Sequence, residues 1–183
     1  CLVGSEMCIR DRDEIRAIEE AYAKAEVPVV SNNSAHRWTP DVPMMVPELN
    51  PEHAEIIPYQ RKRLGTKRGF IAVKPNCSIQ SYTPALHALR EFEPTLVVAT
   101  TYQAISGAGK TFKDWPEMID NVIPYIAGEE EKSEQEPLRI WGKIEDGVIK
   151  KAEGPLITTQ CIRVPVEDGH TAAVLSLIHI SEP

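Results

Sequence analysis

The stretch Lys74-Pro75-Asn76-Cys77-Ser78-Ile79-Gln80 joins a short apolar run, residues 70–73, to a segment with helical spacing. We expect a strand to end before this stretch and a helix to begin after it, as in α/β proteins. A cysteine at such a junction faces unpaired backbone N–H groups, which stabilise a thiolate. Asn76 and Ser78 are polar neighbours of Cys77. They favour a reactive thiol over a small buried hydrophobic side chain, the commonest role of a free cysteine.

The size and composition of the chain narrow the classes of protein it can represent. Its 183 residues suffice for one medium domain or parts of two. A net charge of −7 argues against a general nucleic-acid binder. No apolar run is long enough to span a bilayer and no secretory signal is visible, so we expect no membrane partner. Four cysteines without metal-ligand spacing predict no metal and a reduced, cytoplasmic protein.

The two ends of the chain differ from the rest. Residues 1–12 (CLVGSEMCIRDR) and 175–183 (LSLIHISEP) resemble translated sequencing-adapter sequence, and the chain begins without methionine. We therefore treat both ends as tails outside the fold and expect an internal fragment of a longer protein. This choice removes three residues from any site: Cys1, Cys8 and His179.

The first part of the chain has a helix–strand order. Asp13 can cap a helix whose apolar face carries Ile15, Ile18, Tyr22 and Ala25. Residues 27–30 predict a short buried strand, and this order indicates a mostly parallel sheet. Arg37 follows that strand, where such sheets bind ligands. Its position alone fits a ligand contact and an ordinary solvated charge equally well.

Two further helices are predicted before the middle of the chain. The first begins at Asn50-Pro51, runs towards Arg63, and carries Pro58 as a kink or an early stop. Its basic end, residues 60–63, is interpreted as a solvated helix terminus. The second follows Cys77 and has its core face on Ile79, Tyr82, Leu86 and Leu89.

A β-branched run at residues 95–102 predicts the clearest strand, and it continues into a glycine-rich turn. Gly109-Lys110-Thr111 imitates the end of a phosphate-binding P-loop. That motif needs glycine where this chain has Ala104, so we reject it. The turn remains a place where backbone can approach a bound cofactor closely.

The last third of the chain predicts a helix followed by turns and a strand. An acidic segment, residues 129–140, predicts a helix with a solvated charged face. Asp146-Gly147 predicts a turn, residues 156–166 predict a strand, and residues 167–171 predict another turn.

Three reactive side chains lie near predicted strand ends: Cys77, Arg163 and His170. A thiol nucleophile needs a group that takes and returns protons, and histidine titrates in the required range. An arginine can grip a carboxylate with two parallel hydrogen bonds. On these residues alone the chain fits a thiol protease, an acyl transferase or an aldehyde dehydrogenase working through a thioester.

Three ordered motifs then carry a family resemblance. Residues 75–80 (PNCSIQ), 103–109 (QAISGAG) and 163–171 (RVPVEDGHT) resemble aspartate-semialdehyde dehydrogenase of the archaeal and fungal type. The resemblance covers the chain between its tails.

The resemblance implies a role for each matching residue. Cys77 corresponds to the nucleophile that forms the acyl thioester, and His170 to the general acid/base. The substrate-binding positions are Gln103, Arg163, Glu129 and Asn76. The phosphate-binding positions are Arg37 and Lys132, and the turn that approaches NADP is represented by Ser106, Gly107 and Gly109.

The resemblance also implies an α/β and α+β architecture. Residues 13–75 would be the end of a Rossmann NADP-binding domain, and 76–174 an incomplete catalytic and dimerisation domain of mixed sheet plus helices. The implied partners are aspartyl phosphate, aspartate semialdehyde and inorganic phosphate, in a homodimer or homotetramer. The family's glycine-rich dinucleotide loop and C-terminal helix have no counterpart in these residues, so we expect the chain alone to be inactive.

Three alternatives remain open. A malonyl-CoA or succinyl-CoA reductase of the same family would use the same thiol and Arg163. An inactive dimerisation module would need none of the reactive residues. A thiol hydrolase would need neither NADP nor Arg37.

Overall fold

The computed structural model describes residues 12–178, which form two compact units. Of the described residues, the first unit comprises 12–75 and 139–152, and the second comprises 76–138 and 153–178. The predicted tail 1–12 therefore lies almost wholly outside the described residues. The predicted catalytic domain, 76–174, differs from this division because residues 139–152 return to the first unit.

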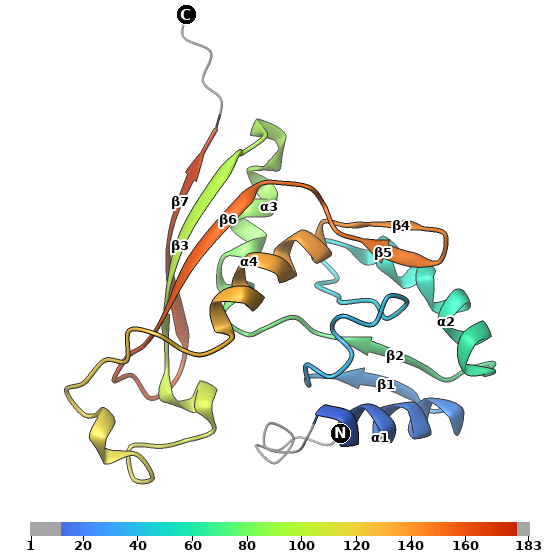
Figure 1. The fold of residues 1–183 in the computed structure, drawn as a ribbon, viewed down its shortest axis with the longest axis horizontal. Helices are drawn as coiled ribbons and strands as arrows, with labels where there is room; N and C mark the ends of the chain where they lie inside the picture. Colours follow the sequence, from blue (N-terminus) through green and yellow to red (C-terminus); the bar gives the residue numbers. More distant parts are fainter. Residues whose placement is uncertain (1–11, 179–183) are drawn as a thin grey trace, which may run out of the picture. The chain divides into compact units, whose positions relative to one another are not determined.

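The first unit contains a parallel pair of strands, as the helix–strand order predicted (Figure 1). Strand β1 (Pro28–Ser31) pairs with β2 (Phe70–Val73), and helix α1 (Arg12–Lys24) contacts both. The expected burial of β1 is wrong in part, because Val30 is 81% exposed. In a two-stranded sheet packed on one side, alternate side chains of each strand face away from the core.

Helix α1 buries only part of the face that its apolar residues predicted. Ile15, Glu19 and Ala23 are buried, whereas Tyr22 is half exposed. The Ser31 hydroxyl on β1 donates a hydrogen bond to the Glu19 carboxylate, which turns this polar residue inward. Asp13 was predicted to cap α1 but lies in its first turn. A negative charge in the first turn is still favourable to the helix dipole.

The helix predicted after residue 50 is two helices. A 3-10 helix, η2 (Pro51–Ile56), leads into α2 (Ile57–Leu64). The predicted kink or stop at Pro58 is wrong, because Pro58 occupies the first turn of α2, where its missing N–H has no helical partner to lose. Gly65 ends α2 in the left-handed conformation, with φ of 73°.

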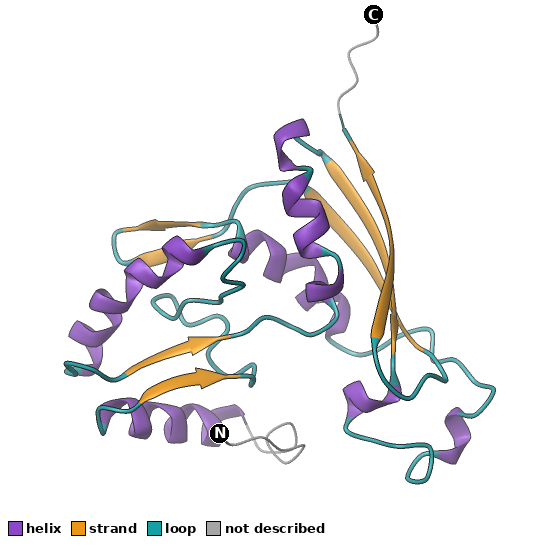
Figure 2. Cartoon of the chain, turned by 180° about the vertical axis from the view of Figure 1, so that it is seen from behind, coloured by secondary structure: helices purple, strands orange, loops and turns teal. Residues whose placement is uncertain are grey.

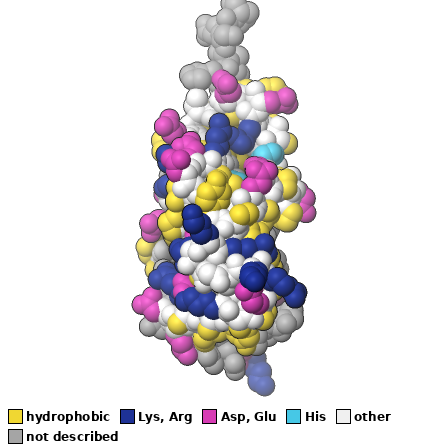
Figure 3. Space-filling view, turned by 90° about the vertical axis from the view of Figure 1, so that its right-hand side faces the viewer, with side chains coloured by type: hydrophobic (Ala, Val, Ile, Leu, Met, Phe, Trp, Pro, Cys, Tyr) yellow, Lys and Arg dark blue, Asp and Glu magenta, His cyan; other side chains and the backbone are white. Residues whose placement is uncertain are grey.

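The basic end of α2 is only partly a solvated terminus. Gln60 is fully buried and its amide donates to the carbonyl oxygens of Asp41 and Ile71, both at 2.9 Å. Arg63 forms an ion pair with the Asp41 carboxylate, with Nη2 2.9 Å from Oδ1. Figure 3 shows how basic and acidic side chains intermingle on the face that it presents.

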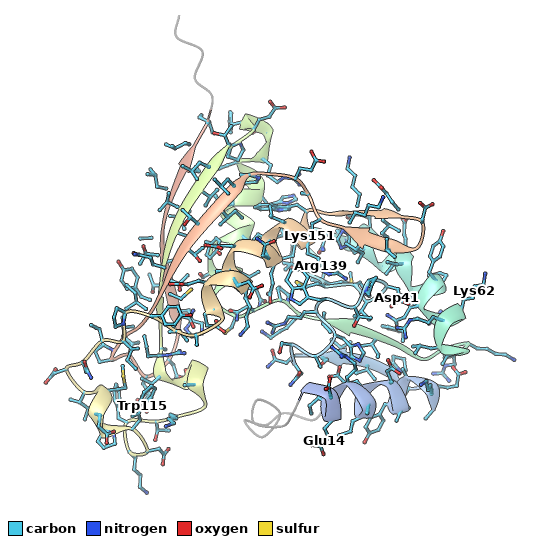
Figure 4. All side chains as sticks on the ribbon, in the orientation of Figure 1. Glu14, Asp41, Lys62, Trp115, Arg139 and Lys151 are labelled. Atoms are coloured by element: carbon cyan, nitrogen blue, oxygen red, sulfur yellow. The ribbon has the colours of Figure 1, made fainter. Side chains whose placement is uncertain are left out.

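Contacts of Arg139 and Trp38 help to hold residues 139–152 in the first unit. Arg139 Nη2 donates to the carbonyl oxygens of Thr39 at 2.6 Å and Val42 at 3.0 Å. The Trp38 ring lies 5.9 Å from Arg139 Cζ and 5.8 Å from Lys151 Nζ, and both cations are labelled in Figure 4. These cation–π contacts and the hydrogen bonds of the Arg139 guanidinium explain why the segment packs with the first unit.

Between those anchors the chain forms a hairpin of β4 (Lys143–Glu145) and β5 (Val148–Lys150). The predicted turn at Asp146-Gly147 is confirmed, with φ of 51° and 76°. Two consecutive positive φ values are typical of the tight turns that match strand twist.

The second unit is built on a three-stranded mixed sheet in the order β6-β3-β7 (Figures 1 and 2). Strand β3 (Leu96–Gln103) pairs in parallel with β6 (Leu156–Arg163) and antiparallel with β7 (His170–Leu177). Two of these strands match the predicted runs 95–102 and 156–166. Residues 175–183 were expected to form a tail outside the fold, but residues 175–177 are the last residues of β7. Residues 179–183 of that predicted tail lie outside the described part of the chain.

The segment after Cys77 is more broken than its periodicity predicted. It forms η3 (Ile79–Ser81), α3 (Thr83–Ala88) and η4 (Arg90–Phe92). Ile79, Tyr82 and Leu86 are buried as expected, but Leu89 is 40% exposed. Because only a three-residue 3-10 helix follows Cys77 closely, the expected N-terminus of a regular helix at the thiol is wrong.

A long loop and an acidic helix complete the second unit. The loop contains η5 (Ile105–Ala108) and η6 (Pro116–Met118) and leads to α4 (Glu129–Ile140). The expected solvated face of α4 is wrong. Glu134 Oε1 accepts the Thr159 backbone N–H at 3.1 Å, so carboxylates of α4 cover the outer edge of β6.

Residues 12–178 include no helix long and apolar enough to cross a bilayer.

Candidate active site

The sheet register of the second unit brings three predicted site residues into one row. Gln103, the last residue of β3, is paired with Arg163 on β6 and with His170 on β7. Side chains directly opposite each other across neighbouring strands lie on the same face of a sheet. Strand pairing alone therefore brings the three side chains together. In the sequence, Gln103 is 60 or more residues from Arg163 and His170, whereas only a short loop separates Arg163 from His170.

Cys77 approaches this row from the segment between β2 and η3. Its sulfur lies 3.2 Å from His170 Nε2, and the thiol is exposed. The other cysteine among the described residues, Cys161, is fully buried on β6. Of these two thiols, only Cys77 combines exposure with an imidazole within hydrogen-bond distance.

The other ring nitrogen of His170 has a backbone partner. The Ala104 N–H donates to His170 Nδ1 at 3.1 Å. Ala104 also accepts from Arg163, whose Nη1 lies 2.7 Å from the Ala104 carbonyl oxygen. One peptide residue thereby holds both the imidazole and the guanidinium, and sequence reasoning singled out Ala104 only to reject a P-loop.

Arg163 is buried, with 5% of its surface exposed. Burial lowers the pKa of its guanidinium, while the charges of Glu129 and Cys77 act in the opposite direction. An arginine remains protonated under such shifts, so a fixed positive charge lies beside the thiol.

Gly107 leaves room for both of these side chains. A methyl group built on Gly107 would lie 2.9 Å from Arg163 Nη1 and 2.9 Å from His170 Cε1. Real Cβ contacts are not that short, so a side chain at this position would displace the guanidinium, the imidazole or both. The exposed residues Ser106 and Gly109 belong to the same turn, and Gly109 has φ of 68°.

A carboxylate network lies around Glu129 at the start of α4. Glu129 accepts hydrogen bonds from Asn76 Nδ2 at 2.8 Å, Gln103 Nε2 at 3.5 Å and Lys132 Nζ at 2.5 Å. Burial raises the pKa of the Glu129 carboxyl, but these donors outweigh it and hold the pKa below the ordinary value. Glu129 is therefore ionised at neutral pH and ties two other residues of the predicted substrate site, Asn76 and Gln103, to α4.

Arg37 is placed in the first unit. It is buried, its Nε donates to the Lys74 carbonyl oxygen at 3.1 Å, and its Nη2 donates to the Asn32 carbonyl oxygen at 3.2 Å. The other predicted site residues belong to the second unit. The phosphate-binding role of Arg37 thus stays a prediction.

The sequence reasoning missed Glu136. This residue of α4 is fully buried, and its Oε2 accepts the backbone N–H of Asn76 at 2.6 Å. Asn76 Oδ1 in turn accepts the Ser78 backbone N–H at 2.8 Å. Both residues that flank Cys77 are thereby fixed, but an acidic run offers no sequence signal that one of its carboxylates faces inward.

Chemically, the arrangement combines an exposed thiol, an adjacent imidazole, a buried guanidinium and an ionised carboxylate. These groups suit addition of a thiolate to the carbonyl carbon of an anionic substrate. Among residues 12–178 no three His, Cys, Asp or Glu side chains gather in a way that could hold a metal ion.

Two sequence families match the chain. The family described as "Semialdehyde dehydrogenase, NAD binding domain" matches residues 7–57, and "Semialdehyde dehydrogenase, dimerisation domain" matches residues 85–179. The second match covers more than half of the chain.

Individual relatives agree with these matches. Aspartate-semialdehyde dehydrogenase of Methanothermobacter thermautotrophicus is 42% identical over 163 residues, covering 88% of this chain and 46% of the relative. The Aspergillus fumigatus enzyme is 41% identical over 161 residues, covering 86% of this chain and 44% of the relative. The chain thus spans about half the length of the curated relatives it matches.

Solved structures give the same result. Aspartate semialdehyde dehydrogenase from Candida albicans, crystallised with NADP, matches with a TM-score of 0.78 and 35% identity over 95% of this chain and 50% of that one. Aspartate semialdehyde dehydrogenase II from Vibrio cholerae, complexed with ASA, matches with a TM-score of 0.66 and 28% identity over 88% of this chain and 52% of that one.

Proposed function

The chain belongs to the semialdehyde dehydrogenase family, and from this premise we propose that it is part of an NADP-dependent aspartate-semialdehyde dehydrogenase. The proposed reaction is the reductive dephosphorylation of aspartyl phosphate to aspartate semialdehyde through a cysteine thioester. It would serve the biosynthesis of lysine, threonine and methionine. The relatives named above support this substrate over an acyl-CoA.

The observation that carries the proposal is the 3.2 Å contact between Cys77 Sγ and His170 Nε2, with Arg163 in the same row of the sheet. In the proposed reaction the Cys77 thiolate attacks the acyl carbon of aspartyl phosphate. The carbonyl π electrons move to oxygen, and collapse of this adduct expels phosphate to leave the thioester. His170 lies where it can serve the proton transfers of the thiol and the tetrahedral adducts.

Charge explains the proposed substrate contacts. Arg163 would bind the substrate carboxylate, with Gln103 and Asn76 orienting the acyl chain beside the thiol. Glu129 would face the substrate ammonium group, and Lys132 and Arg37 would bind phosphate. Glu129 and Lys132 already form an ion pair, so substrate binding would exchange one partner of that pair.

The residues present also fit the proposed NADP. Ser106, Gly107 and Gly109 are exposed, and Gly107 adjoins the His170 ring, so a cofactor could approach the thiol over this turn. When bound, NADPH supplies the hydride that reduces the thioester. The chain's own part is to hold the thioester and to keep Arg163 and His170 in place.

We further propose a homo-oligomeric, cytoplasmic protein. The match to a dimerisation domain supports oligomers, whether dimer or tetramer. The proposed cytoplasmic location rests on the cysteine pattern, the expected absence of nucleic-acid partners on the net charge of −7, and that of membrane partners on the lack of a long apolar run.

The decisive experiment uses the complete protein of which these residues are part. With aspartate semialdehyde, phosphate and NADP, we expect NADPH to form, and Cys77→Ser to abolish its formation. Cys161→Ala is the matched control, because this second thiol is fully buried on β6. Activity that needs malonyl-CoA or succinyl-CoA instead would contradict the substrate, and activity unchanged by Cys77→Ser would contradict the thioester.

A further inference from the structure

Arg37 is the last residue of a short segment, residues 32–37, that follows β1. Its buried guanidinium is oriented by two backbone carbonyl groups: Nε donates to the Lys74 oxygen at 3.1 Å, and Nη2 donates to the Asn32 oxygen at 3.2 Å. Asn32 is the first residue of the same segment. The orientation of the guanidinium therefore depends on what holds segment 32–37 in place.

The start of the segment is tied to α1 through Glu19. Helix α1 lies beside β1 (Figure 1), and the hydroxyl of Ser31, the last residue of β1, donates to the Glu19 carboxylate. The Ser31 oxygen in turn accepts the backbone N–H of Asn33 at 3.0 Å, and Asn33 Oδ1 accepts that of Ala35 at 2.8 Å. A series of hydrogen bonds thus runs from α1 towards Arg37.

A second residue of α1, Arg16, holds the end of the segment. Its Nη2 donates to the Ala35 carbonyl oxygen at 2.8 Å, and its own carbonyl oxygen lies 3.4 Å from His36 Nε2. His36 is fully buried, and its Nδ1 lies 3.0 Å from Thr39 Oγ1. One residue of α1 therefore contacts both residues that precede Arg37.

The buried Glu19 carboxyl is not explained as a counter-ion of His36. Glu19 Oε2 lies 4.0 Å from His36 Nε2, at the limit of an ion pair. Burial lowers the pKa of His36 and raises the pKa of Glu19, and both directions oppose the charged forms. Among the described residues Glu19 Oε2 has no hydrogen-bond partner. The hydrogen bond from Ser31 to Oε1 is thus the contact that gives this carboxyl a structural purpose.

We infer that Glu19 and Arg16 are positioning residues for Arg37. They lie three residues apart in α1, so they share one face of the helix and hold the two ends of segment 32–37. If the segment moved, the Asn32 carbonyl that orients the guanidinium would move with it. A guanidinium binds a phosphate group through a planar fork of N–H donors, which requires a fixed orientation.

This inference rests on the proposed function, because phosphate binding by Arg37 is part of it. It adds the residues that the phosphate site would need behind Arg37. Neither Glu19 nor Arg16 would touch the substrate, so their effect would reach the reaction only through the segment.

Hydrogen exchange of the complete protein, read by mass spectrometry, tests the positioning itself. Three backbone N–H groups of the segment have acceptors nearby: those of Asn33, Ala35 and Arg37. We expect Glu19→Ala and Arg16→Ala to speed exchange in segment 32–37 about tenfold, the effect of losing one hydrogen bond to a charged group. Glu19→Gln keeps an oxygen that accepts the Ser31 hydroxyl, so it should stay within about twofold.

Two controls separate a local effect from unfolding. Exchange in β3 should be unchanged in every variant, and the Arg16 side chain is 48% exposed, so its removal spares the core. Glu20→Ala is the matched variant, because this neighbouring carboxylate of α1 pairs with Lys24 and Arg63 instead. The inference is overturned by unchanged exchange in both alanine variants, and equally by the same acceleration in Glu20→Ala or in β3.

Steady-state kinetics of the complete protein tests the consequence for the reaction. In the direction that consumes phosphate, we expect Glu19→Ala and Arg16→Ala to raise the KM for phosphate about tenfold, with the KM for aspartate semialdehyde unchanged. Glu19→Gln should keep both KM values within about twofold. Loss of folded protein would lower the maximal rate and leave both KM values unchanged, so this difference is specific to positioning.

Arg37→Gln separates the inference from the proposed function. If Arg37→Gln raises the KM for phosphate and the two alanine variants do not, the inference is wrong. If Arg37→Gln leaves that KM unchanged, the proposed phosphate-binding role of Arg37 is wrong, and hydrogen exchange still decides whether α1 positions this residue.

Discussion

Glu136 accepts the backbone N–H of Asn76, the residue before the exposed thiol, at 2.6 Å. The carboxylate is fully buried although it belongs to the most acidic helix of the chain. Burying a carboxylate is costly unless hydrogen bonds satisfy it, and the Asn76 N–H supplies one. Here it fixes the peptide that leads into Cys77.

Glu136→Ala should therefore lower the free energy of unfolding by about 1–3 kcal/mol, the cost of leaving a buried donor without its acceptor. Glu136→Gln keeps an acceptor and should cost less than the alanine variant. Chemical denaturation measures both. Glu131→Ala on the exposed part of the same helix is the control, and an equal loss in that variant would show that Glu136 has no special role.

Gly107→Ala should separate activity from stability. The added methyl group meets Arg163 and His170 at 2.9 Å, so it moves the site while leaving the sheet intact. A misplacement of about 1 Å can reduce kcat about 100-fold. Steady-state kinetics of the complete protein measures this loss. Gly154→Ala meets open space and should retain kcat; comparable losses in both variants would argue against the packing explanation.

Glu26 gives the first unit a pH dependence in acid. Its carboxylate accepts the backbone N–H groups of Arg68, Lys67 and Gly69, which lower its pKa to about 2. Because the folded pKa lies below the unfolded value of 4.5, the stabilisation is present above pH 4.5 and is lost as the pH falls towards 2.

Glu26→Gln should consequently unfold at a lower temperature than the unsubstituted chain at neutral pH, with the difference shrinking below pH 4.5. Thermal unfolding followed by circular dichroism at several pH values tests this. Glu48→Gln, a change at another exposed carboxylate, should give no such convergence. A pH-independent difference for Glu26→Gln would refute the linkage.

Arg163→Lys should weaken the site without removing its charge. The guanidinium donates to the Ala104 carbonyl oxygen while keeping further N–H groups for a substrate carboxylate, a geometry an ammonium cannot reproduce. In the complete protein we expect kcat/KM to fall about 10- to 100-fold, the range of one charge-assisted hydrogen bond. Arg68→Lys on the surface should change little. Full activity of Arg163→Lys would show that charge alone suffices.

The sequence predicted correctly those elements whose signal is carried by neighbouring residues. β-Branched residues identified β3 within one residue at each end, and Asp146-Gly147 specified its turn, because both signals are local. Periodicity failed where a polar residue packs inward. Glu19 is buried in α1 in place of the expected apolar residue, since Ser31 on β1 supplies its hydrogen bond.

For the candidate site, motif resemblance pointed to side chains that the structure brings together, but not to the contacts that hold them. Glu136 looked like one of several solvated acids, and Ala104 contributes only its backbone. Neither role can be read from sequence, because both depend on contacts between segments 60 or 66 residues apart. The predicted boundary between residues 75 and 76 coincides with that of the two units, but the return of residues 139–152 to the first unit was not predicted, because Arg139 finds its acceptors about 100 residues upstream.

Because Gln103 is paired with Arg163 and His170, the effect of an insertion or deletion on the site depends on where in the chain it falls. The loop at 164–169 joins two strands whose register is set elsewhere, so insertions there can be absorbed. A single-residue deletion between His170 and Leu177 cannot be absorbed, because it turns one part of β7 over relative to β3. Either the apolar side chains or the histidine would then face the wrong way, so we expect length variation among homologous chains in the loop and none within β7.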